Sequence, residues 1–332
     1  MIELRKDQLH IRFPELHPQA RMSIDFQRTL RIPDDGKDYP LPAGLGRFPL
    51  RHVDDFGPDV PERWLEHGGV MLPMYQSEAL WINFAGGYPF AVKIAAGKID
   101  AVTGKTWSNS LHRHPQNYVT VPEQPWLDGY CVAKGVIRQF VAMPLGSGYS
   151  AEEQLTGEAE HGGLQIVAYP LKRDVYEEWA AKRQAVFSKS FTPMLAMRCT
   201  GVPDMGLAPG GRMRQEIYDD PFKLTDWDPE HAARCFVHIA NSQVWRAITG
   251  EAPPTVPLTA REYKRNGIPW FEYYSDGKAV EGSGVLDRLK SIAQFATGQR
   301  DEPLSDNDSV EIDRIVVLRQ GLEKGQVREG RF

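Results

Sequence analysis

The sequence predicts a β-rich α+β fold, with an antiparallel sheet of sandwich-like or barrel-like form as its core and a smaller mixed α/β region packed against it. Three observations support this prediction. Apolar and polar residues alternate in short runs near the N-terminus, two blocks of apolar segments lie between residues 70 and 170, and helical periodicity is strongest after residue 170. The longest apolar segment, 135–143, has apolar side chains on both sides of the pleat, which indicates a strand covered on both faces.

The first half of the chain divides into three predicted parts. Residues 1–32 alternate in three short runs and predict N-terminal strands, whereas 33–60 are rich in Pro, Gly and Asp and predict a long loop or a linker. Residues 61–170 predict a β-rich core, packed with 1–32, that begins with a short helix. The strands expected in this core are 79–84, 90–95, 99–102, 118–121, 135–143 and 164–169.

The second half, 171–320, predicts a mixed α/β region followed by a frayed tail, 321–332. Its clearest helix is 174–189, where Asp174 can cap the first turn and Glu177 occupies the capping-box position. The other expected elements are helices at 243–249, 260–265 and 286–296 and strands at 235–240, 268–274 and 310–318. The Gly-rich segment 201–214 is expected to be a loop.

Composition excludes several functional classes. The 332 residues carry a net charge of −5, and no run of Lys and Arg is interleaved with aromatics, which argues against nucleic-acid binding. No window approaches the roughly 18 apolar residues of a membrane span, and the N-terminus has no apolar signal region, so a soluble, cytoplasmic protein is expected. Three scattered cysteines predict reduced, inert thiols: Cys131, Cys199 and Cys235.

The loop 144–163 carries the first candidate site. Glu158 and His161, flanked by glycines, can serve as acid and base or bind a divalent cation. His112 and His114 share a face if their segment is extended, and with His161 they can complete a three-ligand metal site. The alternative for both sets is exposed, solvated loops.

The segment 201–214 carries a candidate anion site. Glycines free backbone N–H groups to turn inward, and two arginines can hold a phosphate or a carboxylate. The residues are Gly210, Gly211, Arg212 and Arg214. Neither a Walker loop nor a dinucleotide-binding glycine motif is present, and the alternative is a flexible connector.

A set of polar and aromatic residues lies inside apolar segments and predicts a buried network. Arg138 and Gln139 need partners because an unpaired buried polar group costs about 2–7 kcal/mol, and we expect Glu78 or Asp128 to neutralise Arg138. Such a network either specifies the fold or lines a pocket for a small polar ligand, a carbohydrate or an anion. The predicted ligand-binding set is Tyr75, Glu78, Trp81, Lys93, Trp126, Asp128, Arg138 and Gln139.

Six strings in the chain carry a resemblance. They are MYQSEALWINF, PEQPWLDG, IRQFVAMPLGSGY, QLTGEAEHGGLQI, CFVHIANS and PPTVPLTAREYKRNGIPWFEYY. They resemble segments of an uncharacterised family of bacterial hypothetical proteins of similar length. The resemblance spans about 71–274, which implies that this part of the chain is a single unit and not a mosaic of separate segments. It implies no activity, cofactor or site.

Two functions from different classes follow. The first is a binding or assembly protein that acts through the β-rich core and the long loops, on a protein partner, on a second copy in a homo-oligomer, or on a small polar or anionic ligand. The alternative is a hydrolase-type enzyme, in one form divalent-metal-assisted, with Glu158 and His161 as acid–base or ligand groups and Arg138 as an electrophilic clamp. No motif indicates a cofactor or an activated nucleophile. An enzyme requires these groups to converge in one concave site.

Overall fold

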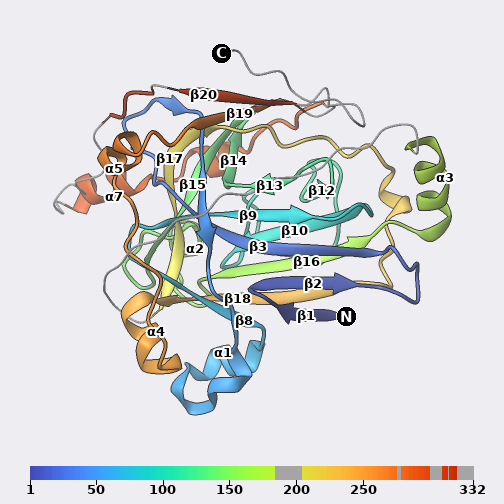
Figure 1. Ribbon diagram of the computed structural model, residues 1–332, viewed down its shortest axis with the longest axis horizontal. Helices are drawn as coiled ribbons and strands as arrows, with labels where there is room; N and C mark the ends of the chain where they lie inside the picture. The colour runs from blue at the N-terminus through green and yellow to red at the C-terminus, as the bar shows by residue number, and fades with distance from the viewer. Residues whose placement is uncertain (184–203, 275–277, 300–308, 313, 320–332) are drawn as a thin grey trace.

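The computed structural model describes residues 1–183, 204–274, 278–299, 309–312 and 314–319. Strands dominate it, arranged in three sheets, and helices lie at the margins (Figure 1). The predicted β-rich α+β class is therefore confirmed. Within the described ranges every sheet is open, so none closes into a barrel. The sheets are also mixed and not purely antiparallel, as the pairings below show.

The largest sheet has ten strands. They are β1 (Ile2–Arg5), β2 (Gln8–Arg12), β3 (Arg21–Thr29), β4 (Asp38–Tyr39), β6 (Gly44–Arg47), β9 (Ala79–Ala85), β13 (Trp126–Leu127), β14 (Gly129–Ala133), β15 (Val136–Pro144) and β17 (Met205–Arg214). The main order is β1-β2-β3-β9-β15-β17-β4, and β6, β13 and β14 pair with β3, β9 and β15. The pairing of β17 with β4 is parallel.

Two smaller sheets complete the β structure. The seven-stranded sheet contains β7 (Arg51–His52), β8 (Val70–Met74), β10 (Phe90–Ala96), β11 (Ile99–Asp100), β12 (Val119–Val121), β16 (Leu164–Pro170) and β18 (Ala233–Asn241). The three-stranded sheet contains β5 (Leu41–Pro42), β19 (Trp270–Tyr274) and β20 (Ile315–Arg319). The pairs β18–β8 and β19–β20 are parallel.

The helices are short. They are α1 (Glu62–His67), α2 (Ala151–Thr156), α3 (Arg173–Arg183), α4 (Ser242–Thr249), α5 (Ala260–Arg265), α6 (Gly284–Asp287), α7 (Ile292–Gln299) and the 3-10 helices η1 (Val53–Asp59) and η2 (Leu224–Asp226). The predicted helix 174–189 corresponds to α3 as far as residue 183, and its remainder lies outside the described residues. The predicted helix 286–296 is divided in two, α6 and α7, because Ser291 caps a new helix within it.

Local sequence signals set several helix ends. Thr259 and Glu262 form a capping box at the start of α5. Gly250 ends α4 in the left-handed conformation. The cap of α4 is Asn241, whose side chain accepts a free backbone N–H of the first turn.

The prediction of a loop at 201–214 is wrong for Met205–Arg214. These residues form β17, which pairs with β15 along most of its length. The glycines are required by close packing and not by a turn: a Cβ on Gly210 would lie 2.6 Å from Val141 Cγ2, and one on Gly211 would collide with the carbonyl oxygen of Pro33. Residues 201–203 lie outside the described part.

Side chains from both large sheets meet in one hydrophobic cluster. Phe26 on β3 and Phe140 on β15 belong to the ten-stranded sheet, whereas Ile94 on β10 and Ile166 on β16 belong to the seven-stranded sheet, and all four are in this cluster. Pairing also crosses the predicted boundary at residue 170, because β17 and β18 lie beside β15 and β16.

Candidate functional site

Two adjoining cavities lie beside the polar loop that connects β11 to β12. The larger has a volume of about 400 Å³, the smaller about 150 Å³, and Thr103 and Pro115 belong to the walls of both. The larger is also lined by Val102, Arg113, Gln116, Asp219 and residues 278–283. The smaller is also lined by Asp100, Lys105, Thr106, Ser108, His112, His114 and Asn117.

Side-chain bonds to the backbone hold the loop in place. The Arg113 guanidinium donates to the carbonyl oxygens of Asp220, at 2.6 Å, and of Phe222. The Asn117 side chain accepts the backbone N–H of His112 at 2.7 Å. These contacts anchor the loop to the segment before η2, so the walls of the cavities are preorganised.

The segment 278–284 closes the other side of the larger cavity. The Ser283 hydroxyl donates to the carbonyl oxygen of Thr103 at 2.6 Å. Gly282 lies against Ala133 of β14 so closely that a Cβ there would collide with that backbone. Both walls are thus tied to the sheets.

A buried ion pair lies beneath the smaller cavity. Lys93 Nζ on β10 is 3.5 Å from Asp100 Oδ2, and the two side chains are 1% and 3% exposed. The ammonium group also donates to the carbonyl oxygen of Ser110 at 3.1 Å and lies 5.1 Å from the centre of the Trp107 ring. Burial lowers the pKa of Lys93 and raises the pKa of Asp100, while the attraction between them opposes both shifts. The pair brings no net charge to the cavity.

The expected neutralisation of Arg138 by Glu78 or Asp128 is wrong. Glu78, in the turn before β9, accepts a 2.7 Å hydrogen bond from Arg28 Nε on β3. The Asp128 carboxylate accepts from Gln215 at 2.7 Å. In the part of the chain that the structure describes, Nε and Nη1 of Arg138 have no hydrogen-bond partner. The register decides this outcome, because β9 lies between β3 and β15 and Glu78 faces β3.

The rest of the predicted ligand-binding set is divided between the two large sheets. Gln139 on β15 bonds the backbone of residues 30 and 32, with distances of 2.9 and 2.8 Å. The Tyr75 hydroxyl donates to the carbonyl oxygen of Pro254 at 2.8 Å. Trp81 and Trp126 make an edge-to-face contact with ring centres 6.2 Å apart. Lys93 belongs to the other sheet, so the eight residues do not line one pocket.

The predicted anion-site arginines have carboxylate partners. Arg212 Nε is 2.8 Å from Asp38, and its Nη1 is 3.4 Å from Asp287. Arg214 is 2.5 Å from Glu272. Gly210 and Gly211 serve the packing of β17, as described above. Anion binding at these four residues stays a prediction.

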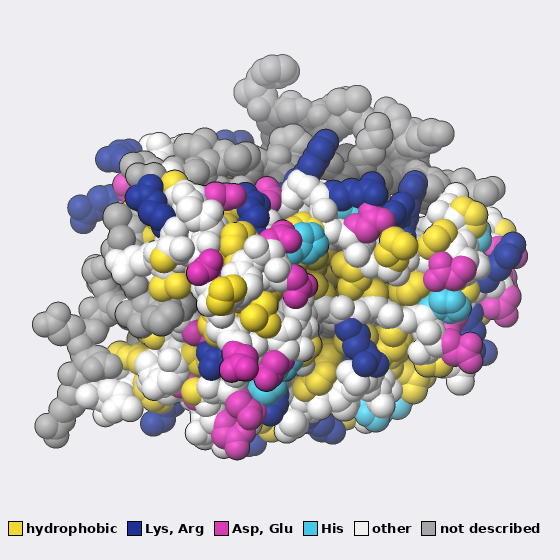
Figure 2. Space-filling view, turned by 90° about the horizontal axis from the view of Figure 1, so that it is seen from below, with side chains coloured by type: hydrophobic (Ala, Val, Ile, Leu, Met, Phe, Trp, Pro, Cys, Tyr) yellow, Lys and Arg dark blue, Asp and Glu magenta, His cyan; other side chains and the backbone are white. Residues whose placement is uncertain are grey.

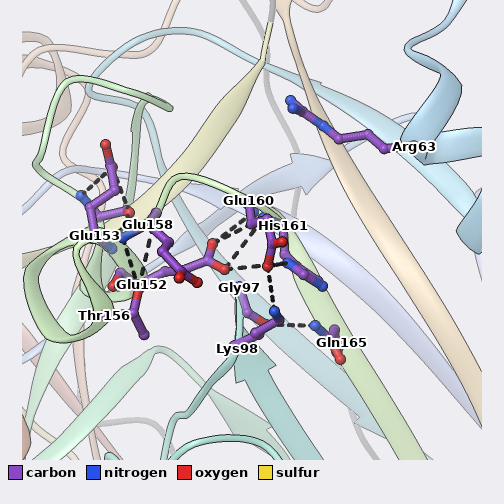
Figure 3. Close-up of polar contacts among 12 residues, drawn as sticks. Arg63, Gly97, Lys98, Glu152, Glu153, Thr156, Glu158, Glu160, His161 and Gln165 are labelled. Atoms are coloured by element: carbon purple, nitrogen blue, oxygen red, sulfur yellow. Dashed lines mark hydrogen bonds and ion pairs between the residues drawn. The ribbon is translucent and has the colours of Figure 1, made fainter.

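The loop 144–163 brings a carboxylate and an imidazole together (Figure 3). Glu152, on α2, is buried and accepts the backbone N–H groups of His161 and Gly162 at 3.3 and 2.9 Å. His161 Nδ1 lies 3.5 Å from Glu152 and 3.4 Å from Glu160. Burial raises the pKa of Glu152, and burial followed by the charge of Lys98 lowers the pKa of His161. The arrangement can hold a neutral imidazole beside a carboxyl group.

The carboxylates beside His161 are therefore Glu152, which is buried, and Glu160, and not the predicted Glu158, whose side chain is exposed. The sequence contained a signal for this difference. Ser150 and Glu153 form a capping box, which announces a short helix inside the predicted loop. A helix there directs Glu152 toward Gly97, where a Cβ would collide with the carboxylate.

The three predicted metal ligands do not form one site. His112 and His114 line the smaller cavity, whereas His161 lies beside α2. Among the described residues, no group of three or more His, Cys, Asp and Glu is arranged to hold a metal ion.

Burial disfavours the thiolate form of both described cysteines. Burial raises the pKa of Cys131 and of Cys235 to about 12, so neither forms a thiolate at neutral pH. Cys199 lies outside the described residues. This agrees with the inert thiols that the sequence predicts.

Charged side chains of both signs share the molecular surface. Figure 2 shows the molecule from below, with Lys and Arg interspersed among Asp, Glu and His and with hydrophobic side chains between them. No helix in the described ranges is long and apolar enough to cross a membrane. No protein-family model, curated protein or solved structure matches the chain.

Proposed function

We propose that the protein binds a small polar ligand in the two adjoining cavities. The observation that carries this proposal is the larger cavity of about 400 Å³, whose wall includes Arg113, Gln116 and Ser283, each held by a hydrogen bond to a backbone carbonyl. Ligand sites in proteins typically occupy about 300–1,000 Å³ and place a few fixed polar groups around the ligand. The sequence predicts binding through the loops 144–163 and 201–214, whereas these cavities are lined by the loop between β11 and β12 and by residues 278–283. A protein partner and self-association stay predictions.

The distribution of acid–base groups favours binding over catalysis. His112 and His114 line the smaller cavity, but Glu152, His161 and Arg138 are absent from the residues that line either cavity. An enzyme requires its acid, base and clamp to converge on one reacting atom. The cavities therefore support recognition of a ligand more than its hydrolysis.

Filling the smaller cavity tests the proposal. Ser108 is exposed at its wall, so we expect Ser108→Trp to block the cavity without unfolding the protein. A panel of sugars, amino acids and small carboxylates is screened by thermal shift, and each hit is titrated by calorimetry. We expect Ser108→Trp to weaken the binding of a hit by about tenfold or more.

The matched control is Ser147→Trp, which places the same side chain on an exposed loop that does not line either cavity. It should bind each hit like the wild type. Hits that bind Ser108→Trp as tightly as the wild type would place the ligand elsewhere and overturn the proposal.

The pair of Glu152 and His161 favours a second candidate, a hydrolase-type enzyme in which His161 activates water and Glu152 orients the imidazole. Nitrophenyl esters and phosphate esters provide the assay. If this candidate is right, Glu152→Gln and His161→Gln should each lower kcat/KM by about 10²–10⁴. Glu158→Gln is the control from the same loop and should leave the rate unchanged. Equal rates in all three variants would exclude this site as the source of activity.

A further inference from the structure

We propose that the smaller cavity binds an oxyanion, the phosphate or carboxylate group of a small organic ligand whose remaining part lies in the larger cavity. This inference rests on the proposed function and names the chemical class of the ligand. It follows from the side chains that line the smaller cavity, from the pairing of its one carboxylate, and from the contrast with the larger cavity.

Five side chains that line the smaller cavity can donate a hydrogen bond to a ligand. Lys105 supplies an ammonium group, His112 and His114 supply imidazoles, and Thr106 and Ser108 supply hydroxyl groups. None of these five side chains has a hydrogen bond or an ion pair to another described residue. An ammonium, two imidazoles and two hydroxyls around one hollow match an acceptor with several oxygen atoms.

The one carboxylate in the same wall is directed to groups of the protein. Asp100 Oδ1 accepts from the backbone N–H of Val102 and from both the N–H and the hydroxyl of Thr103, at 3.1, 2.9 and 3.0 Å. Its Oδ2 is buried, has no hydrogen-bond partner among the described residues, and lies 3.5 Å from the ammonium group of Lys93. The Asn117 oxygen accepts from the loop backbone. A cationic ligand would therefore find no free carboxylate in the smaller cavity, whereas an anion finds free donors.

The larger cavity has a different character. It contains two carboxylates, Asp219 and Glu281, together with Arg113 and Lys278. Asp219 pairs with Arg113 and Glu281 pairs with Lys134, so the charges in this wall balance, whereas the smaller cavity has the Lys105 ammonium in excess and is the better place for an anion. Because the cavities share Thr103 and Pro115, one ligand can place its anionic group in the smaller and an uncharged polar body in the larger.

The first experiment uses inorganic phosphate as the probe on the full chain. Calorimetry at constant ionic strength compares the wild type with the triple variant Lys105→Ala/His112→Ala/His114→Ala. All three side chains are exposed, so the variant should fold. We expect saturable binding to the wild type and at least a tenfold loss in the triple variant. Phosphate also stabilises folded proteins generally, so the difference between the two proteins is the readout.

The matched control is Lys290→Ala/His10→Ala/His52→Ala, which removes the same side-chain types away from the cavities. It should bind phosphate like the wild type. Phosphate that fails to bind the wild type in a saturable manner, or that binds both triple variants equally, overturns the inference.

A second set of titrations compares acetate, ribose and ribose 5-phosphate. Tighter binding of ribose 5-phosphate than of phosphate, with no binding of ribose, supports an anionic group joined to an organic body. Equal affinity for phosphate and ribose 5-phosphate overturns the placement of the body in the larger cavity. If a neutral compound binds and is lost in Ser108→Trp while phosphate and acetate do not bind, the proposed function holds and the oxyanion inference fails.

Discussion

Glu78→Ala should lower the free energy of unfolding by about 3–5 kcal/mol, because it leaves a buried guanidinium without its counter-ion. The side chains of Arg28 and Glu78 are 5% and 2% exposed, and they meet at 2.7 Å. Glu78 also accepts the backbone N–H of Tyr75 at 2.9 Å, which would lose its partner too. Urea unfolding at pH 7, with the midpoint and slope compared with the wild type, measures the loss.

The stranded charge, and not the attraction within the pair, is the reason for this large effect. Burial raises the pKa of Glu78 even though Arg28 opposes the shift, so burying the pair is itself unfavourable. The double variant Arg28→Met/Glu78→Leu should therefore recover most of the stability. A double variant as unstable as Glu78→Ala would show that packing dominates.

Arg138→Met is the control for Glu78→Ala, because it also changes the charge balance at a buried guanidinium by a single substitution. Arg138 is 6% exposed, and its Nε and Nη1 have no hydrogen-bond partner among the described residues. Burial lowers the pKa of Arg138 even though the charges of Asp34 and Asp287 oppose this shift, so removing its charge relieves desolvation and the free energy of unfolding should stay equal or rise. A loss as large as that of Glu78→Ala would mean that Arg138 has a partner in solution.

Asp128→Asn should stabilise the protein at pH 8 by on the order of 4 kcal/mol and should have little effect at pH 4. Asp128 is fully buried, and burial raises its pKa to about 7, whereas the bond from Gln215 opposes this shift. An unfolded Asp has a pKa of about 3.9. The native state thus binds the proton more tightly, and its stability decreases as pH rises from about 4 to about 7. Urea unfolding across this range measures the slope.

His238 makes the free energy of unfolding change with pH in the opposite direction over the same range. The informative quantity is therefore the difference in free energy of unfolding between Asp128→Asn and the wild type at each pH. His238 is buried, its Nε2 lies 3.0 Å from the carbonyl oxygen of Gly68, and burial lowers its pKa to about 4. This group removes stability as pH falls from about 6.5 to about 4. The exposed Asp59→Asn is the control for Asp128→Asn. Equal pH profiles for the two variants would contradict a buried Asp128 carboxyl.

Short-range signals in the sequence were sufficient for most elements. Alternation and apolar runs predict β9, β10, β15, β16 and β18 within a few residues, and the capping box at Thr259 predicts α5. The box at Ser150 was equally readable and marks α2, which the prediction of a plain loop missed. Such signals work because caps and pleats involve residues a few positions apart.

Long-range partners could not be predicted in the same way. Gly210 and Gly211 predicted a loop because glycine marks both turns and close packing, and only the neighbouring strands show which applies. The cavities also escaped prediction, because their walls come from residues 100–117 and 278–283. Among the residues predicted as functional, His112 and His114 line a cavity, and His161 pairs with a carboxylate.

The sequence was sufficient to predict the β-rich class, the positions of most strands and the need of Gln139 for partners, whereas Arg138, for which a partner was also expected, has Nε and Nη1 without one among the described residues. Tertiary structure decided which groups met: Arg28 with Glu78, Lys93 with Asp100, and Arg138 with none of the predicted acids. Local propensity depends on neighbours in the chain, whereas a buried charge is neutralised by whichever group the sheet register places within a few ångströms.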